Sequence, residues 1–366
     1  MKKRKDGRYS RKFYFNGKPY FAYGHSKKEL DQKEHRKRIE LETGKKDHDD
    51  PTVDAFYEAF TDARRGTISP NTIRGQKGEY KVMAAIIIPR LEKRFGLLRL
   101  SEVTDEDILI LQRTLQEQAP LKVNDYIGHL RYVFKTAVQK HRIPYNPCDP
   151  VKNIKRTAEL AFDTTHRGLE RDEQRAFFAA AKELNSIHIN VYRFACSTGV
   201  RLGEAGALYT SDIRNGNVII QRTVTRTESG LYVVGESAKT EAGRRTIPMN
   251  DNICQIIADQ KVLNKMLYGD KVALLHDRLF RAPEGGLLTA TINRDIKKIC
   301  KYAGIEPFTF HCFRHTFATR ALEQGMDLVI LSKILGHSKV AITLKYYGHV
   351  LDDTKREAMN KLVIEA

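Results

Sequence analysis

Two polar stretches divide this chain into segments with different hydrophobic patterns. One runs from Lys45 to Pro51, and the other, from Lys152 to Arg156, follows a helix-ending cluster at Tyr145-Asn146-Pro147 and Pro150. Charged or Pro-rich stretches between patterned segments indicate linkers. At 366 residues the chain is also too long for one core, because domains typically hold roughly 100 to 200 residues. The sequence predicts four segments: residues 1–48, 51–156, 161–350 and a tail, 351–366.

The first segment has the pattern of a small α+β domain. Residues 8–23 alternate as strands do, and Asn16-Gly17 between two aromatic runs is a strong hairpin signal. Ser26 is suited to cap a charged helix from about Lys27 to Glu42. We expect a three-stranded sheet with one helix.

Positive charge is concentrated in this first segment. The chain holds 63 Lys and Arg against 45 Asp and Glu, a net charge of +18. Residues 1–28 contain ten Lys or Arg and one Asp, so 10 − 1 = +9, half of the excess. Such a surface suits a polyanion, because neutralised phosphates release condensed counterions. Two interpretations stay open: a sheet that contacts DNA, with Lys12 and Lys18 as candidates, or a small core with a solubilising surface.

The second segment has a helical pattern. Helices are expected at residues 53–63, 69–88, 104–118 and 122–141. Ser69-Pro70 places a capping hydroxyl before a first-turn proline, and Thr104 with Asp107 forms a variant of the capping box. In the fourth helix Arg131 and Lys135 lie four residues apart, away from the apolar face. This pair predicts either a solvated face or a contact with DNA phosphates.

The third segment is mixed but mainly helical. Between Asp212 and Pro248, β-rich runs are separated by the turn signals Asn215-Gly216 and Ser229-Gly230. We expect a small antiparallel sheet within helices. The predicted fold class is therefore a multidomain chain, mainly α with small β-sheets.

The cysteines and apolar runs exclude several classes of protein. The five cysteines are odd in number, widely spaced and without a Cys-x-x-Cys pair, which argues against disulfides and a zinc knuckle. The longest apolar run, Val82 to Ile88, is far shorter than the ~20 residues that span a bilayer. Asp6-Gly7-Arg8-Tyr9 also interrupts any signal peptide. We expect a soluble, cytoplasmic protein without a membrane partner.

Short strings in the third segment carry reactive side chains. They are Thr198–Glu204, His311–Thr316, Leu335–Ser338 and Tyr347–Val350. Two guanidiniums can bind the nonbridging oxygens of a phosphodiester, and Arg201 and Arg314 are the candidates. The i, i+3 spacing puts His311 and Arg314 on one helical face. We expect His315 to point elsewhere as a packed residue.

With Lys239 in the string Ser237–Pro248, these motifs resemble the tyrosine recombinase (phage integrase) family, in the form carried by prophages and conjugative transposons. The resemblance implies an arm-binding domain at residues 1–48, a four-helix core-binding domain and a mostly helical catalytic domain. It implies six catalytic positions: Arg201, Lys239, His311, Arg314, His337 and Tyr347. Lys239 would be the general acid, His311 would transfer protons with the nucleophile, and His337 would donate to a nonbridging oxygen.

Several site residues keep an alternative. Glu204 would orient an arginine or histidine in the family, but an ordinary surface carboxylate is the other interpretation. Tyr347 lies ten residues after His337, the spacing that favours it as nucleophile, and Tyr346 is the alternative. Arg244 and Arg245 would hold backbone phosphates or carboxylates.

The expected reaction is transesterification through a 3′-phosphotyrosyl bond and a Holliday junction, which integrates or excises a mobile element. No metal and no cofactor are expected, since the carboxylate runs do not resemble a two-metal site. The resemblance implies duplex DNA with core and arm sites, a homotetrameric synapse, and a directionality factor or host DNA-bending protein. The tail would pack on its own protomer or dock on a neighbouring protomer. The alternatives are a dimer-resolving recombinase and a non-catalytic DNA-binding regulator.

Overall fold

The computed structural model describes residues 7–43, 50–155, 167–236, 243–269, 277–344 and 346–347. The chain separates into two compact units, Met1–Phe162 and Asp163–Ala366, and each is described by itself. Helices predominate and the sheets are small, which confirms the predicted fold class. Across the described ranges, none of the helices combines the length and the hydropathy that a bilayer crossing needs.

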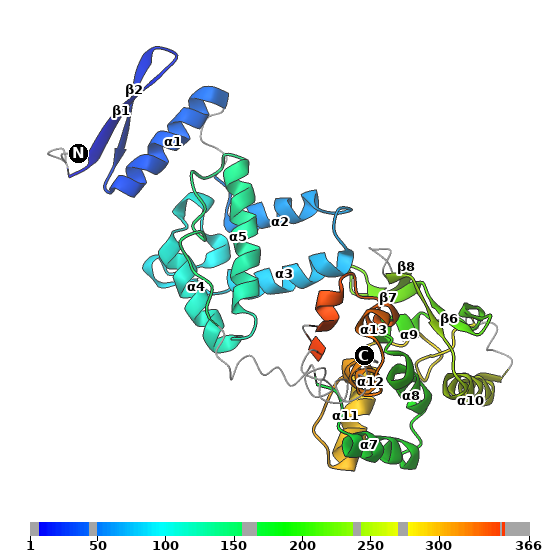
Figure 1. The fold of residues 1–366 in the computed structure, drawn as a ribbon. Coiled ribbons are helices and arrows are strands. Elements are labelled where there is room, and N and C mark those ends of the chain that lie inside the picture. The colour runs from blue at the N-terminus through cyan, green and yellow to red at the C-terminus, as the bar shows by residue number, and fades with distance from the viewer. Residues whose placement is uncertain are drawn as a thin grey trace, which may run out of the picture. The chain divides into compact units, whose positions relative to one another are not determined.

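The first unit begins with a hairpin that lies beside a helix (Figure 1). The elements are β1 (Tyr9–Phe15), β2 (Lys18–Gly24) and α1 (Lys27–Thr43). Asn16 and Gly17 form the turn with φ angles of 46° and 77°, which confirms the predicted hairpin. Ser26 Oγ accepts from the backbone N–H of Glu29 at 3.1 Å and caps α1, as predicted. A three-stranded sheet is expected here, whereas residues 7–43 contain two strands; residues 1–6 lie outside the described ranges.

The hairpin presents two different faces. On the face toward α1, Arg11 donates to Glu34 at 2.9 Å. On the opposite face Tyr14 is 59% exposed and Phe21 is 52% exposed. Lys12 pairs with Phe21 across the strands, and its ammonium lies 5.0 Å from the centre of the Tyr14 ring. Aromatic rings beside cations are therefore available to a partner on this face.

The same unit continues with the predicted helical bundle. Its helices are α2 (Val53–Ala63), α3 (Pro70–Ala84), α4 (Asp105–Gln118) and α5 (Val123–Gln139). Ser69 and the Thr104–Asp107 capping box begin α3 and α4 as predicted. The third helix ends at Ala84 rather than near residue 88, because β3 (Ile87–Ile88) pairs with β4 (Lys93–Arg94). Three single 3-10 turns follow, at Pro89–Leu91, Phe95–Leu97 and Leu100–Glu102.

One of the two predicted DNA contacts in this bundle has a structural role. Arg131 donates to the carbonyl oxygens of Cys148, at 3.3 Å, and Val151, at 2.7 Å. Its guanidinium thus fastens the chain after α5 to the bundle, and the side chain is partly buried, so Arg131 is not simply a solvated cation. Its contact with a DNA phosphate stays a prediction. Lys135, one turn further along, is exposed.

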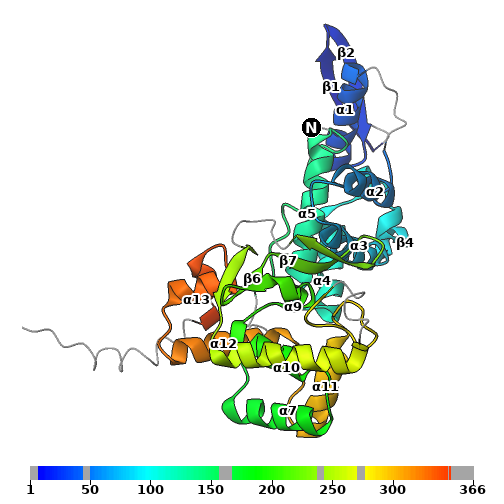
Figure 2. The same ribbon diagram turned by 90° about the vertical axis from the view of Figure 1, so that its right-hand side faces the viewer.

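The second unit combines helices with two small antiparallel sheets. Its helices are α7 (Arg171–Glu183), α8 (Ile189–Thr198), α9 (Leu202–Gly206), α10 (Asp251–Tyr268), α11 (Ile292–Ala303), α12 (His311–Glu323) and α13 (Leu328–Leu335). Its strands are β5 (Ile213–Arg214), β6 (Asn217–Ile220), β7 (Arg222–Arg226), β8 (Tyr232–Glu236) and β9 (Arg245–Pro248), and a 3-10 turn occupies Thr210–Asp212. One sheet has the order β5-β6-β9 and the other pairs β7 with β8, where a single sheet is expected. The strands gather at one end of the unit, and α7 and α11 lie at the other (Figures 1 and 2).

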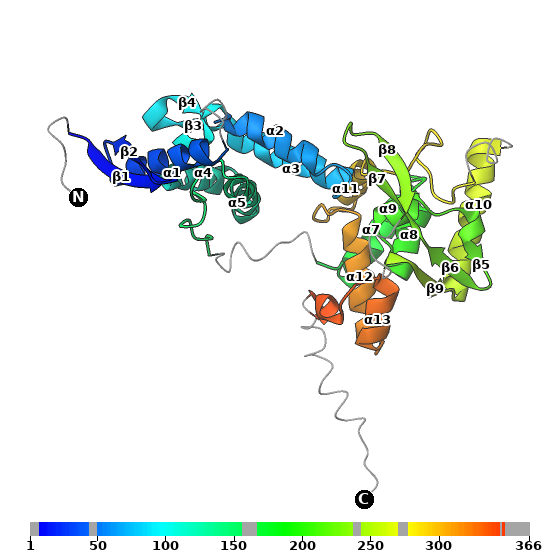
Figure 3. The same cartoon turned by 90° about the horizontal axis from the view of Figure 1, so that it is seen from above.

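Helix α8 organises the part of this unit that carries the predicted motifs. It contacts both α10 and α12 (Figure 3), and Tyr192 of α8 packs against Phe313 of α12 with ring centres 5.2 Å apart. The helix ends at Gly199, whose φ of +66° is the left-handed conformation. A Cβ there would lie 2.5 Å from Phe317 Cδ1, so only glycine fits this turn. The turn brings Arg201 to the start of α9.

Candidate active site

Arg314 lies at the centre of the site and is 2% exposed. Its guanidinium donates to the carbonyl oxygens of Gly199 and Leu335, both at 2.8 Å. These acceptors lie at the ends of α8 and α13, so the side chain of Arg314 is held by one segment 115 residues away and another 21 residues away. Burial, and then the nearby charge of Arg201, lowers the pKa of Arg314 to about 9, which leaves it positively charged at neutral pH.

Glu204 joins two other arginines and is 3% exposed. It accepts from Arg245 Nη1 at 3.0 Å and Nη2 at 2.7 Å, and from Arg201 Nη1 at 2.9 Å. Burial raises the pKa of Glu204, but hydrogen bonding and charge from Arg245, with help from Arg201, more than offset this, and the pKa falls to about 2. The carboxylate is therefore ionised and has the geometry of an arginine-orienting group. Its burial rules out an ordinary surface carboxylate.

Arg245 is a correction to the predicted DNA contacts. Its side chain is 5% exposed and forms a bidentate pair with Glu204. Its Nε also donates to the carbonyl oxygen of Ile334. The guanidinium therefore holds a carboxylate, one of its two predicted partners, and is not presented to a DNA backbone. Its neighbour Arg244 is exposed.

His337 is bound on both ring nitrogens. Arg314 Nη2 lies 2.8 Å from Nε2, and Thr343 Oγ1 lies 2.7 Å from Nδ1. A guanidinium can only donate, so the network assigns Nε2 as acceptor and places the ring proton on Nδ1, which donates to Thr343. Burial, and then the charges of Arg314, Arg201, Arg245 and His311, lower the pKa of His337 to about 4. In this DNA-free structure the imidazole is neutral at physiological pH.

The two adjacent tyrosines lie in different surroundings. Helical residues 340–344 and 346–347, here called the tyrosine segment, carry Tyr347, which is 3% exposed, and Tyr346, which is 40% exposed. Burial raises the pKa of Tyr347 to about 12, although the charge of Arg314 acts in the opposite direction. Tyr347 Oη lies 2.7 Å from His315 Nδ1. The geometry therefore brings Tyr347 together with Arg201, Glu204, His311, Arg314 and His337, through direct bonds or mutual charge.

The expectation that His315 points away from the site is wrong. Residues four apart on a helix differ by roughly 40° in direction and residues three apart by roughly 60°, so His311, Arg314 and His315 share one face. The rings of His311 and His315 have centres 4.8 Å apart. His315 is buried, as a packed residue would be, but it also binds the phenol.

Other parts of the site carry little or no signal in the sequence. The i, i+4 spacing of Thr343 and Tyr347 could have linked Thr343 to the site, whereas the carbonyls of Gly199 and Leu335 are main-chain groups that no motif reveals. Lys239 and the tail at 351–366 lie outside the described residues. Lys12 and Lys18 are exposed, as the predicted DNA contacts require. Within the described ranges, no three His, Cys, Asp or Glu side chains come together as a metal-binding group.

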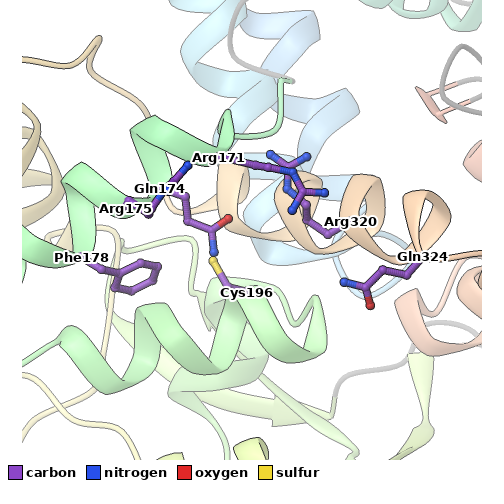
Figure 4. A pocket seen from close by; sticks show the side chains of 7 residues that line it. All are labelled: Arg171, Gln174, Arg175, Phe178, Cys196, Arg320 and Gln324. Carbon is purple, nitrogen blue, oxygen red and sulfur yellow. The ribbon is translucent and has the colours of Figure 1, made fainter. Parts of the chain in front are cut away.

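A separate open hollow of about 720 Å³ lies between α7, α8 and α12 (Figure 4). It is lined by Arg171, Gln174, Arg175, Phe178, Cys196, Arg320 and Gln324. Arg171 and Arg320 both bind Glu323, at 2.8 and 2.6 Å, and Arg175 binds a neighbouring carboxylate. Arg171 and Arg175 are 66% and 77% exposed, so solvent screens most of the charge in this hollow, whereas the arginine cluster around Glu204 is largely buried.

The fold and the site define an enzyme of the tyrosine recombinase class, which cuts and rejoins DNA strands. The chain belongs to the phage integrase family, whose model matches residues 167–354, just over half of the chain. It is 25% identical over 319 residues to the ICEBs1 integrase of Bacillus subtilis, covering 85% of this chain and 82% of that protein. It is 27% identical to the transposase from transposon Tn916 of Enterococcus faecalis, covering 98% of this chain and 93% of that protein.

The solved structure of the Tn1549 transposon integrase in complex with a circular intermediate DNA matches with a TM-score of 0.68 and 25% identity, covering 85% of this chain and 99% of that one. The chain is thus a site-specific recombinase of the mobile-element type.

Proposed function

We propose that the chain integrates and excises a mobile element by cutting duplex DNA through a 3′-phosphotyrosyl bond at Tyr347. One observation carries the proposal. Three guanidiniums, those of Arg201, Arg245 and Arg314, surround the single carboxylate of Glu204, so the cluster has a net charge of 3 − 1 = +2. A site with excess buried positive charge is suited to an anion, and a DNA phosphodiester supplies one.

The two arginines not sequestered by a bidentate pair would bind the phosphate. Arg314 is held by carbonyl oxygens, which do not neutralise its charge. Arg201 is 41% exposed, so part of its guanidinium remains accessible. Arg245 would act indirectly, because it fixes Glu204 and Glu204 in turn fixes Arg201. Preorganised charge of this kind stabilises the transition state without reorganisation during the reaction.

His337 would change its protonation state when DNA binds. Its low pKa reflects burial and surrounding positive charge, and a bound phosphate offsets the charge. The pKa should therefore rise, so that His337 takes up a proton on Nε2 and donates it to a nonbridging oxygen. Arg314 would then exchange its bond to Nε2 for a bond to the phosphate.

The chemical step would be an in-line transesterification. Tyr347 Oη attacks phosphorus, the P–O5′ bond breaks, and Lys239 protonates the departing 5′ oxygen. We expect His311, whose charge acts on His337, to take part in proton transfer with the nucleophile, as the family resemblance implies. Bond energy stays in the phosphotyrosyl linkage, so a partner strand's 5′ hydroxyl can reverse the attack without ATP.

The partners follow the mobile-element type. The relative of known structure was solved with DNA, which supports duplex DNA as the substrate. We propose that residues 1–48 bind arm sites through the exposed face of Lys12, Tyr14 and Phe21, while residues 51–156 and 161–350 hold the core site. We also propose that the chain assembles as a homotetramer in the synapse and acts with a directionality factor or host DNA-bending protein. Its location would be cytoplasmic, and its tail at 351–366 would dock on a neighbouring protomer.

A covalent trapping experiment tests this function. The full chain would be expressed with its neighbouring element DNA and lysed in denaturant, and the covalent adducts would be isolated for peptide mapping and DNA sequencing. We expect attachment at Tyr347, its loss in Tyr347→Phe, and its retention in the matched variant Tyr346→Phe. An adduct on Tyr346 would reassign the nucleophile. DNA binding without any adduct, even on nicked substrates, would instead support a non-catalytic DNA-binding regulator.

A further inference from the structure

The phenol of Tyr347 is bound by a side chain to which the proposed mechanism gives no role. Its oxygen lies 2.7 Å from His315 Nδ1, and both residues are 3% exposed. Tyr347 belongs to an apolar cluster with Leu331 and Leu335. Burial in this cluster raises the pKa of the phenol to about 12, so ionisation before attack is unfavourable. The nucleophile needs a group that removes its proton as the new bond forms. The family resemblance gives this proton transfer to His311, but the imidazole bound to the phenol oxygen in this structure is that of His315.

We propose that His315 is a catalytic residue that accepts the phenol proton of Tyr347 during strand cleavage. The inference rests on the proposed function, since it concerns the same reaction. As the P–Oη bond forms, the Oη–H bond breaks and the proton passes to Nδ1. The P–O5′ bond breaks at the other side of phosphorus, and the 5′ oxygen takes its proton from the acid assigned to Lys239. When the strand is rejoined, His315 returns its proton to Oη as the P–Oη bond breaks.

The surroundings of His315 suit this role. In the tautomer that carries its proton on Nε2, His315 presents an acceptor at Nδ1 to the phenol, whose O–H then donates. The rings that lie against it are those of His311 on its own helix and of Tyr346 and Tyr347 on the tyrosine segment. The positive charge of Arg314 acts on Tyr347 and favours the developing phenolate.

Two hydrogen bonds, one helical turn apart, hold the tyrosine segment in place. Thr343 Oγ1 is bound to His337 Nδ1 at 2.7 Å, and Tyr347 Oη is bound to His315 Nδ1 at the same distance. Thr343 is fully buried. This support restricts the phenol to one position, as general base catalysis requires of its reacting atoms. Thr343 therefore offers a matched control, because it contributes to the same docking without touching the reacting oxygen.

The test is single-turnover cleavage of a nicked duplex that carries the site mapped by the trapped adduct. His315→Asn keeps an acceptor oxygen near the position of Nδ1 but cannot take up a proton at neutral pH. We expect its cleavage rate to fall about 10²- to 10⁴-fold. We also expect that a fluorotyrosine at position 347, whose phenol ionises more readily, restores at least about tenfold in this variant and has no such effect in Thr343→Val.

The cleavage rates of these variants support or overturn the role of His315. A His315→Asn rate within about threefold of wild type overturns it, since general base catalysis contributes about 10²-fold or more. A slow variant that fluorotyrosine does not restore also overturns it and leaves His315 a structural role. Thermal unfolding and DNA retention check the fold, and His315→Gln replaces the asparagine variant if that one unfolds. Absence of the Tyr347 adduct in wild type would contradict the proposed function itself, whereas a normal adduct with unaffected variants contradicts only the role of His315.

Discussion

The helical bundle of the first unit and the second unit each contain an arginine in a bidentate pair with a buried carboxylate. The second unit is here called the catalytic unit because it carries the candidate active site. In the bundle, Arg90 donates to Asp107 through Nε at 2.8 Å and Nη2 at 2.5 Å. In the catalytic unit, Arg245 donates to Glu204 through two nitrogens. The Asp107 side chain has no exposed surface and the Glu204 side chain is 3% exposed. Local geometry therefore does not distinguish a structural pair from one at a reactive site.

The difference lies in the charge around each pair. Asp107 has one arginine partner, and its other bonds cap α4 through Thr104. Glu204 serves Arg201 as well as Arg245, and the charge of Arg314 is also close. A balanced pair needs no further partner, whereas three cations around one anion are suited to an additional anionic ligand. Counting charge over the whole cluster separates the two cases.

The largest expected effect concerns the unbalanced cluster. Arg314→Met should reduce strand cleavage by about 10²- to 10³-fold or more, because it removes a preorganised phosphate donor. Its free energy of unfolding should change by less than about 2 kcal/mol, since the loss of two carbonyl bonds is offset by removal of a buried excess cation. Single-turnover cleavage and thermal unfolding measure the two quantities. A variant that unfolds easily would mean that the cluster is structural.

The balanced pair should behave in the opposite way. Arg90→Met leaves Asp107 buried and unpaired, which should lower the free energy of unfolding by about 3 kcal/mol. Cleavage per folded molecule should be unchanged, because Arg90 supports only the bundle. Denaturant titration with a parallel cleavage assay is the measurement. Loss of cleavage at full folding would break the comparison.

Acid should act on the catalytic unit through Glu204. Its pKa falls from an ordinary value of 4.5 to about 2 in the folded chain, so the stability it contributes is present above pH 4.5 and is lost as pH falls toward 2. The difference corresponds to about 3 kcal/mol. Glu204→Gln should lack this component in unfolding curves recorded between pH 5 and pH 2. If wild type and Glu204→Gln lose stability equally as the pH falls, Glu204 is not the source of the acid sensitivity.

The smallest expected effect sharpens the charge count. Glu204→Gln raises the net charge of the cluster from +2 to +3, so sulfate should stabilise this variant more than wild type, by a few degrees in Tm at equal ionic strength with chloride. Asp107→Asn in the bundle is the matched control, and its sulfate preference should be smaller because the charge of its pair changes only from 0 to +1. An equal response of both variants would indicate general salt effects.

Local features of the fold were predictable from the sequence because their causes are local. The Asn16-Gly17 turn and the caps at Ser69 and Thr104 depend on neighbouring residues, and the structure contains each of them. The end of the third helix was not predictable in the same way. It stops at Ala84 because Ile87–Ile88 pairs with a strand further along the chain.

The site was predictable in its membership and not in its contacts. The family that the motifs resemble implied Arg201, His311, Arg314, His337 and Tyr347, which the fold brings together. The roles of Arg131, Arg245 and His315 depend on partners between 17 and 89 residues away. Sequence reasoning treated the arginines as surface cations because charge on a basic chain is usually exposed. Only the folded chain reveals which carboxylate, carbonyl or phenol each one meets.

Arg314 is oriented by the main-chain oxygens of Gly199 and Leu335 as well as by the side chain of His337. A protein engineer who replaces surface side chains to redirect this enzyme to a new target would leave these two anchors in place. A substitution at Gly199 itself would disturb the site, because an added methyl group would collide with Phe317. Retargeting libraries should therefore vary the exposed contacts freely and keep position 199 constant, because a change there would displace the cutting centre without touching DNA.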